Sequence, residues 1–386
     1  MNLFQEILYS DLMTLIENNE AFYFKDFEKD GAEFRIFNYR LASYGDFCLP
    51  NALECRGHMF LMKDGQPIRL ASLPMSKFFN IYENPFTENL DLDTVTDIMV
   101  KEDGSLISTY YNHSSYSSNH SLHFKTKGSL TSDQVLAVEA YFQNVDEDGK
   151  LFYNELDILT CDGHTVNMEW TSPNNRIVLG YEREALVVLN VRDNDTGEYI
   201  SKSTLETYGY QSIISHWVKS VLSGENIGTF VKEIPSMENI EGYVLRLSSG
   251  QHIKVKTDWY LVRHRTKDSI NHPRNLFAAI ISEAVDDIRS LFHNDPISIK
   301  IINDMVALVE PKYNHLIKTV ETFYEANKTQ TRKDYAIKAQ GLQDGLMGLY
   351  MNLYIGREND YKDFAIKNYK MFIGEVKEDI DEQDIN

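Results

Sequence analysis

The sequence predicts an α+β fold, with a mostly antiparallel sheet domain in the first two thirds of the chain and an all-helical domain after it. Short segments rich in β-branched and aromatic residues, bounded by Gly, Asn, Asp or Pro, recur along the first part. They do not alternate regularly with helical segments, which argues against a doubly wound parallel sheet. After residue 260 the apolar residues recur at helical spacing instead. The chain has 386 residues, of which 42% are hydrophobic, so we expect two domains with packed cores.

The first part opens with a predicted helix, and strands follow it. Leu3, Ile7, Leu12, Leu15 and Ile16 recur at the spacing of one helix face. The strand-like segments after this helix are short, and turn residues separate them. They are predicted at residues 33–37, 58–62, 68–71, 106–111, 122–125, 165–170, 185–191, 242–247 and 252–256.

The second part is predicted to consist of helices. Apolar residues from Leu276 to Leu291 mark one face of a single helix. Further helices are expected over residues 297–326, 331–354 and 361–373. The change from strands to helices places the domain boundary near residues 257–265.

The charge is distributed unevenly over the predicted domains, which are residues 1–260, a helical domain over 261–374, and an acidic tail over 375–386. The net charge is -20, from 58 acidic and 38 basic residues. Residues 1–260 carry 38 acidic and 21 basic side chains, whereas residues 261–386 carry 20 and 17. Phosphate contacts need clustered Lys and Arg, so we do not expect bulk electrostatic attraction to nucleic acid.

The cysteines and the hydropathy indicate a cytoplasmic protein. Cys48, Cys55 and Cys161 form no C-x-x-C pair, so neither a disulfide framework nor a structural zinc site is expected. A reducing cytosol fits this pattern. The sequence shows no signal-peptide pattern and no apolar run long enough to span a bilayer, so no membrane partner is expected.

The most informative motif is Lys101-Glu102-Asp103-Gly104, between two predicted strands. Lys-x-Asp-Gly is the nucleophile signature of covalent nucleotidyltransferases, although Asp-Gly is also a common turn dipeptide. Other short motifs lie before and after it along the chain. In chain order, the five motifs are Arg56-Gly57, Lys101-Glu102-Asp103-Gly104, Glu169 in a predicted strand, Glu241-Gly242 and Lys254-Val255-Lys256. This is the order found in the ligase and capping-enzyme superfamily, and five weak signals in the right order make one strong signal.

The resemblance is closer than the superfamily, because several longer segments resemble the phage ATP-dependent RNA ligases of the tRNA-repair type. These segments are residues 53–60, 74–80, 101–105, 174–179, 190–193, 239–243, 256–260 and 335–341. The resemblance covers nearly the whole chain. Only residues 204–236 and the acidic tail are poorly matched.

The resemblance implies that Lys101 attacks the α-phosphorus of ATP to form a lysyl-AMP. An ordinary lysine has a pKa near 10.4, and its amine attacks only where nearby cations or burial lower that value. Lys254 and Lys256 alternate with apolar residues, so a strand places both on one face, where they can meet phosphates and supply a cationic field. Two solvent-exposed lysines on a strand are the alternative.

The resemblance also implies a set of ATP-binding residues. Arg56, Lys77 and Lys127 would hold the triphosphate or the leaving pyrophosphate, Arg56 by a bidentate contact and the lysines as point charges. Tyr39 would join them, although a tyrosine in that context is more often a core residue. Phe79 corresponds to an aromatic residue beside the adenine, and a core phenylalanine is an equal alternative.

Carboxylates would complete the site with Mg²⁺, or with Mn²⁺ in its place. Glu169 would hold a hydrated metal ion near the α-phosphate, and Glu241 would lie near the ribose and the metal-bound water. Asp286 and Asp287 would contribute to a second metal at the β- and γ-phosphates. Adjacent carboxylates on a helix point in different directions, so two solvated side chains are the competing interpretation there.

We therefore predict an ATP-dependent RNA ligase that joins 3′-OH and 5′-phosphate ends, with tRNA cleaved in the anticodon loop as the implied substrate. A separate polynucleotide kinase/phosphatase that heals the ends is an expected partner, and the location would be the host cytoplasm if a phage encodes the chain. The rivals are a capping-type guanylyltransferase, a DNA ligase and a non-catalytic RNA-binding protein on the same fold. The two rival enzymes predict a β-rich domain after residue 256. We expect weak binding to bulk RNA, and dependence on Mg²⁺ and on a particular end structure.

Overall fold

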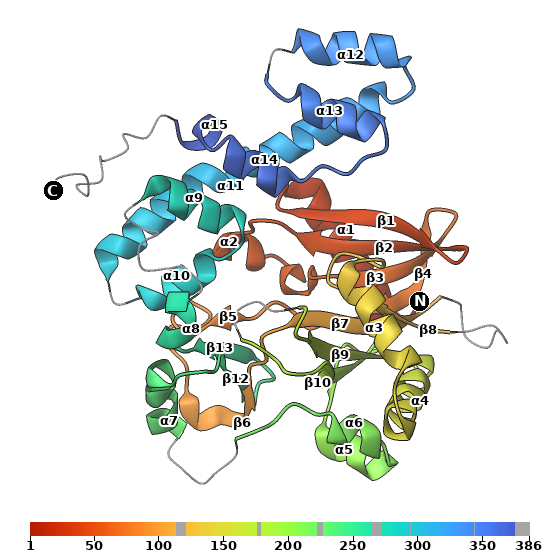
Figure 1. Cartoon of the computed structure of the whole chain (residues 1–386), viewed down its shortest axis with the longest axis vertical. Coiled ribbons are helices and arrows are strands. Elements are labelled where there is room, and N and C mark those ends of the chain that lie inside the picture. The colour runs from red at the N-terminus through yellow and green to blue at the C-terminus, as the bar shows by residue number, and fades with distance from the viewer. Residues whose placement is uncertain are drawn as a thin grey trace. The chain divides into compact units, whose positions relative to one another are not determined.

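The computed structural model of the chain divides into two compact units, Met1–His264 and Arg265–Asn386, which we describe separately (Figure 1). The structure describes residues 1–112, 121–175, 179–221, 227–263, 272–293, 295–342 and 344–374. The predicted acidic tail, residues 375–386, lies outside these ranges. No helix among the described residues is long and apolar enough to cross a membrane.

The described residues of the first unit form three sheets. The first is purely antiparallel, in the order β1-β2-β3-β4, and the second has the order β11-β10-β9-β7-β8. The third has the order β5-β13-β12-β6, in which β5 alone runs parallel to its neighbour. The strands are β1 Phe22–Lys29, β2 Ala32–Tyr39, β3 His58–Lys63, β4 Gln66–Ser72, β5 Phe79–Asn80, β6 Val95–Val100, β7 Ser105–Tyr111, β8 Leu122–Lys125, β9 His164–Thr171, β10 Ala185–Asp193, β11 Tyr199–Ile200, β12 Gly242–Leu247 and β13 His252–Lys256.

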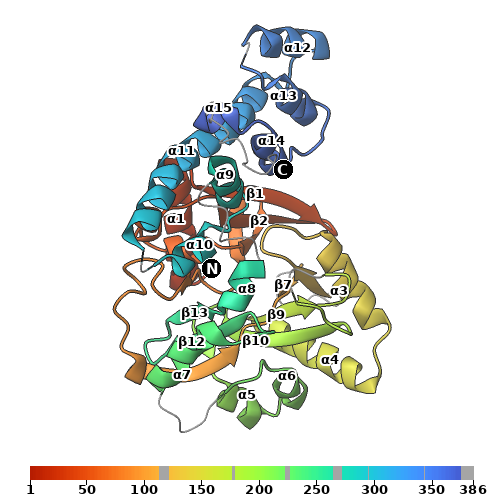
Figure 2. The ribbon, with the colours of Figure 1, turned by 60° about the vertical axis from the view of Figure 1, so that its left-hand side comes forward.

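Helices cover the outer faces of these sheets (Figure 2). The predicted opening helix is α1, Leu3–Asn18, and its buried stripe of Leu8, Leu12 and Leu15 packs on the first sheet. α3 (Asp133–Gln143) and α4 (Glu147–Cys161) cover the second sheet. α7 (Ile227–Glu233) and the following turn pack on the third sheet. The remaining helices of this unit are short: α2 Tyr44–Phe47, α5 Lys202–Tyr208, α6 Gln211–Ser215 and α8 Asp258–Arg263.

The second unit is helical throughout its described residues. Its longest element, α11 (Pro296–Asn327), contacts α9, α13 and α15. Its buried face includes Val306, Val309, Ile317 and Val320, which recur at helical spacing. The other helices are α9 Pro273–Ile281, α10 Val285–Leu291, α12 Arg332–Gly341, α13 Met347–Tyr354, α14 Tyr361–Lys367 and α15 Lys370–Ile373.

The predicted elements are largely confirmed, with corrections at helix breaks. Each predicted strand corresponds to an observed one, but β1, β5, β6 and β11 were not predicted. The single helix predicted over 276–291 is wrong: α9 ends at Ile281, and Glu283 takes a left-handed φ of 61° before α10 begins. The helix predicted over 331–354 is likewise two helices, α12 and α13, and the helix predicted over 361–373 is divided into α14 and α15.

Candidate active site

Lys101 lies at the point where the chain passes from one sheet to another. It follows β6 of the third sheet, and β7 of the second sheet begins four residues later. Its backbone N–H donates to the carbonyl of Gly242 at 3.0 Å, which continues the β6–β12 pairing by one residue. The lysine is therefore held by the third sheet, next to the start of β12.

The amine of Lys101 contacts a buried carboxylate that it shares with a second lysine. Nζ of Lys101 lies 2.9 Å from Oε2 of Glu241, and Nζ of Lys256 lies 3.0 Å from Oε1 of the same residue. The side chain of Glu241 is 3% exposed, whereas that of Lys101 is 22% exposed. Sequence reasoning placed only cations beside Lys101. The structure adds an anion that neutralises part of their charge and fixes both amines.

Two glycines permit this close packing. Gly242 has a φ of 149°, and a Cβ built there would lie 2.0 Å from the carbonyl oxygen of Val255. A Cβ on Gly104 would lie 2.2 Å from the carbonyl oxygen of Trp170 in β9. Both approaches are closer than real Cβ contacts permit, so any side chain would move the backbone. The glycines of the Lys-x-Asp-Gly and Glu-Gly motifs are therefore required by packing.

Glu169 borders the same loop from the second sheet. It pairs with Leu106 in the β7–β9 register, and its Oε1 accepts a hydrogen bond from the backbone N–H of Gly104 at 3.1 Å. Loss of hydration raises the pKa of Glu169 to about 7. The charge of Lys101 and the Gly104 hydrogen bond oppose this rise, and the charge of Glu241 adds to it.

Asp103 anchors the loop, a role that sequence reasoning did not assign. Its carboxylate is buried and accepts hydrogen bonds from the hydroxyl of Tyr260 at 2.9 Å and the backbone N–H of Leu179 at 2.7 Å. Its own N–H donates to the hydroxyl of Tyr181. The ring of Tyr260 also lies 5.0 Å from Nζ of Lys256. The signal in the sequence was the aspartate of the Lys-x-Asp-Gly motif. A buried aspartate needs several hydrogen-bond donors, so it can fix the groups that surround it.

The structure brings four of the predicted ATP-binding residues into one aromatic and cationic cluster. Nζ of Lys77 lies 5.7 Å from the ring centre of Tyr39 and 5.0 Å from that of Phe79, and Nζ of Lys127 lies 5.1 Å from Tyr39. Phe79 is only 5% exposed and packs against Phe47 and other core rings. Its contact with adenine stays a prediction, since this position is also that of a core aromatic residue.

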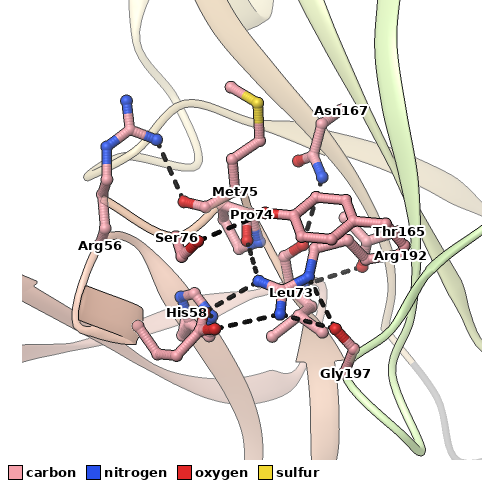
Figure 3. Close-up of polar contacts among 12 residues, drawn as sticks. Arg56, His58, Leu73, Pro74, Met75, Ser76, Thr165, Asn167, Arg192 and Gly197 are labelled. Atoms are coloured by element: carbon pink, nitrogen blue, oxygen red, sulfur yellow. Dashed lines mark hydrogen bonds and ion pairs between the residues drawn. The ribbon is translucent and has the colours of Figure 1, made fainter. Parts of the chain in front are cut away.

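Arg56 and Lys254 are the remaining cations predicted to bind ATP. Lys254 lies opposite Asn80 in the β13–β5 pairing, and its Nζ lies 5.8 Å from the ring centre of Phe78. Arg56 donates to the carbonyl of Met75 at 3.2 Å (Figure 3). Its charge is a further influence that opposes the rise in the pKa of Glu169. Behind it, the fully buried Lys125 donates to the carbonyl of Gly57 at 2.8 Å. Burial, followed by the charge of Arg56, lowers the pKa of Lys125 to about 7. Sequence reasoning missed Lys125, because nothing in a short strand marks a lysine as buried.

The predicted metal ligands are divided between the two units. Glu169 belongs to the first unit, whereas Asp286 and Asp287 lie in α10 of the second, where Asp286 approaches Arg289 at 3.8 Å. The described part of the chain contains no group of three or more His, Cys, Asp or Glu side chains that could hold a metal ion. The metal role of these residues stays a prediction.

Two models of known protein families match this chain. A model described as "RNA ligase" matches residues 54–260, which include every predicted catalytic residue. A second model, described as "T4 RNA ligase 1, C-terminal domain", matches residues 267–378. The chain belongs to the RNA ligase family. The ligase thus has both parts that this family's models describe.

Individual relatives of the ligase share about a quarter of its residues over the matched regions. A protein of Thermovibrio ammonificans named "Putative RNA ligase" is 26% identical over 78% of this chain and 77% of its own length. A protein of Autographa californica nuclear polyhedrosis virus named "Putative bifunctional polynucleotide kinase/RNA ligase" is 25% identical over 73% of this chain, which spans 44% of the viral protein. An archaeal ATP-dependent RNA ligase of known structure matches 82% of this chain and 80% of its own, with a TM-score of 0.45 and 11% identity. That last likeness adds nothing to the assignment.

Proposed function

We propose that this ligase uses ATP to seal 3′-OH and 5′-phosphate RNA ends through a lysyl-AMP and an RNA-adenylate. The observation that carries the proposal is the placement of Lys101 against Glu241 and Lys256, with Glu169 of β9 hydrogen-bonded to the loop that follows Lys101. The proposed nucleophile Lys101, the ion-paired Glu241 and Lys256, and the carboxylate of Glu169 lie together there. This is the set of groups that nucleotidyl transfer to an amine requires.

Three displacements at phosphorus make up the reaction. Nζ of Lys101, as the unprotonated amine, bonds to the α-phosphorus of ATP and gives up a further proton, while the bond from that phosphorus to the bridging oxygen breaks and pyrophosphate leaves. A 5′-phosphate oxygen of the RNA then bonds to the same phosphorus, the bond from phosphorus to Nζ breaks, and the lysine takes up a proton. Finally the 3′-hydroxyl attacks the 5′-phosphorus, loses its proton, and AMP departs. Positioning and electrostatic stabilisation account for most of the catalysis in such transfers.

The residues around Lys101 divide the work of binding ATP. Arg56, Lys77 and Lys127 are the proposed contacts for the β- and γ-phosphates, with Tyr39 beside both lysines. Lys254 and Lys256 are the proposed contacts for the α-phosphate, because they alternate along β13 and Lys256 already shares Glu241 with Lys101. Glu241 would bind the ribose, and Phe79 would contact the adenine.

Glu169 fits a role as a magnesium ligand. A carboxylate whose pKa is raised by loss of hydration gains from a cation, and Mg²⁺ is commonly bound through one or two carboxylates with several waters retained. Bound Mg²⁺, or Mn²⁺, would neutralise phosphate charge. Asp286 and Asp287 are proposed to contribute to a second metal ion, from the helical unit.

The proposed RNA substrate is a tRNA cleaved in the anticodon loop, and the helical unit is the proposed recognition domain. The near balance of charge over residues 261–386 favours recognition of a particular structure over bulk attraction. A kinase/phosphatase that supplies the required 3′-OH and 5′-phosphate ends is the proposed partner. The viral relative carries both names in one description. We propose the cytoplasm as the location, that of the host if a phage encodes the chain.

The test is transfer of label from α-labelled ATP and Mg²⁺ to the protein. We expect the wild type and Lys150→Ala to become labelled and Lys101→Ala to remain unlabelled, because only Lys101 supplies the attacking amine. Lys150 is a surface lysine paired with Glu147, so it is a matched control. A wild type that accepts no label from ATP would refute the proposal. Labelling from GTP instead would favour the capping alternative.

A further inference from the structure

Arg192 is buried and forms a bidentate ion pair with Glu54, whose side chain is 22% exposed. Nη1 lies 2.9 Å from Oε2 of Glu54, and Nη2 lies 3.1 Å from Oε1. The guanidinium side chain is only 3% exposed. Arg192 lies near the end of β10, whereas Glu54 lies in the turn between β2 and β3, 138 residues away in sequence. The pair therefore ties the second sheet to the segment that carries Arg56.

The same guanidinium holds two backbone carbonyls as well. Nη1 donates to the carbonyl of Pro74 at 2.8 Å, and Nη2 donates to that of Gly197 at 2.7 Å (Figure 3). Nε also donates to Gly197, at 3.2 Å. All three nitrogens of the side chain are thus engaged, in a planar fork that a lysine cannot reproduce.

Side chains hold the segment between β4 and β5 that Arg192 contacts through Pro74. Leu73 donates its N–H to Oγ1 of Thr165 at 2.8 Å and accepts from the amide of Asn167 at 3.3 Å. Figure 3 shows these contacts converging on the backbone from Leu73 to Met75, with Arg56 bonded to the carbonyl of Met75. These side chains hold the segment together with a backbone hydrogen bond, which the N–H of Lys77 donates to the carbonyl of Leu53 at 2.7 Å.

Arg192 therefore contacts the two segments that carry proposed contacts for the β- and γ-phosphates. Its partner Glu54 precedes Arg56 by two residues, and its partner Pro74 precedes Lys77 by three. The guanidinium also lies over the ring of Tyr199 at 4.7 Å. One side chain thus contacts residues next to both Arg56 and Lys77 in the chain.

The charge of this pair is satisfied internally. Burial raises the pKa of Glu54, but the charge of Arg192 and the neighbouring His58 outweigh it and hold that pKa well below its usual range. Nε2 of His58 lies 2.8 Å from the carboxylate, and its ring is fully buried. Arg192 is therefore committed to protein groups and is not itself available to bind a phosphate.

We propose that Arg192 is a positioning residue for ATP: through Glu54 and Pro74 it fixes the segments that carry Arg56 and Lys77. The proposal rests on the proposed function, because those two cations are its ATP-phosphate contacts. It predicts that loosening Arg192 impairs the use of ATP, while sealing of RNA that already carries the adenylate proceeds, since that step involves no β- or γ-phosphate.

The test compares Arg192→Lys and Glu54→Gln with the wild type in two reactions of the full chain. The first is formation of lysyl-AMP from ATP, and the second is sealing of chemically pre-adenylated RNA without ATP. We expect the KM for ATP to rise about tenfold or more in both variants, and the rate of sealing pre-adenylated RNA to stay within about threefold of wild type. Thermal unfolding of each variant establishes that it is folded at the assay temperature.

Arg69→Lys is the matched control, because Arg69 is another shielded arginine of the first unit and donates to the carbonyl of Tyr111 at 3.0 Å. We expect it to keep the wild-type KM. An unchanged KM for ATP in folded Arg192→Lys, or an equal loss in both reactions, would overturn the positioning role. Failure of the wild type to form lysyl-AMP would instead overturn the proposed function, so the two failures are distinguishable.

Discussion

Glu54 and Glu169 are both shielded carboxylates of the first unit, yet their surroundings shift their pKa values in opposite directions. Glu54 meets a bidentate guanidinium, and its pKa is lowered. Glu169 receives one backbone hydrogen bond and faces a second carboxylate, Glu241, and its pKa is raised to about 7. The negative charge of Glu54 is balanced by Arg192 within the protein, whereas an added cation would stabilise the ionised form of Glu169.

This difference separates structural support from the reaction site. A buried pair that satisfies its own charges fixes the backbone but has no capacity left for a ligand. A carboxylate that is poorly compensated in the protein alone keeps that capacity, at some loss of stability.

Gly104→Ala should have the largest effect, on the reaction site alone. Its Cβ would lie 2.2 Å from the carbonyl of Trp170, so the loop must move away from β9 and carry Lys101 with it. We expect lysyl-AMP formation to fall by about a hundredfold or more, since small displacements of a nucleophile cost that much. Single-turnover labelling with α-labelled ATP measures it.

Gly45→Ala is the control for that change. A Cβ there would meet only Oγ of Ser43, at the ordinary distance of 3.7 Å. We expect wild-type labelling. Wild-type labelling by Gly104→Ala would show that the loop tolerates the displacement and that the glycine is not required.

Glu54→Ala should have the next largest effect, on stability. It leaves the guanidinium of Arg192 buried without its carboxylate, and breaking such pairs costs about 3–5 kcal/mol in free energy of unfolding. Urea unfolding of the full chain, followed by a probe in the first unit, measures the loss. The control is Glu147→Ala, an exposed carboxylate paired with Lys150, for which we expect a change below about 1 kcal/mol. Equal losses in the two variants would contradict the distinction.

Glu169→Gln should have the smallest effect, and one of opposite sign. The folded protein holds this pKa at about 7, above the ordinary 4.5, so the folded state binds more protons between those pH values. The stability of the wild type therefore declines as pH rises from 4.5 to 7. Glutamine cannot ionise, so metal-free Glu169→Gln should exceed wild type by about 1–3 kcal/mol at pH 8, with no difference near pH 4.

Added Mg²⁺ sharpens that comparison. If Glu169 holds the ion, Mg²⁺ should raise the thermal midpoint of the wild type at pH 8 more than that of Glu169→Gln, because binding to the folded state stabilises it. The midpoint is read without any reaction. An equal rise in both proteins would remove Glu169 as the ligand, and a less stable Glu169→Gln at pH 8 would contradict the raised pKa.

Local patterns in the sequence predicted most of the sheet framework but not its edges or its helix breaks. The nine predicted strands have compact runs of apolar residues. In β1, the exposed residues Lys25, Asp26 and Glu28 interrupt the aromatic residues, which obscured the strand. The break at Glu283 was hidden because Val285 and Ile288 continue the apolar spacing of α9 after the turn. Periodicity measures which residues are apolar, and it does not show where the backbone turns.

Within the site, the motifs indicated the chemistry and missed the supports. Lys101, Glu241 and Lys256 were named from the order of the motifs and from the family resemblance, and the structure brings them within ion-pair distance. The partner of Glu54 lies 138 residues away, and no local pattern links the two. Buried pairs of this kind depend on tertiary packing, which a single sequence does not record.

The path of the chain through Lys101 also has a mechanical consequence. Lys101 is hydrogen-bonded to β12, and its partners Glu241 and Lys256 border the same sheet, whereas Glu169 belongs to β9 of the other sheet. Sliding of one sheet against the other would keep Lys101 with Glu241 and change its separation from Glu169. The four residues from Lys101 to Gly104 therefore connect the third sheet to the second. A small shift of one sheet along the other would change the distance between the nucleophile Lys101 and the carboxylate of Glu169.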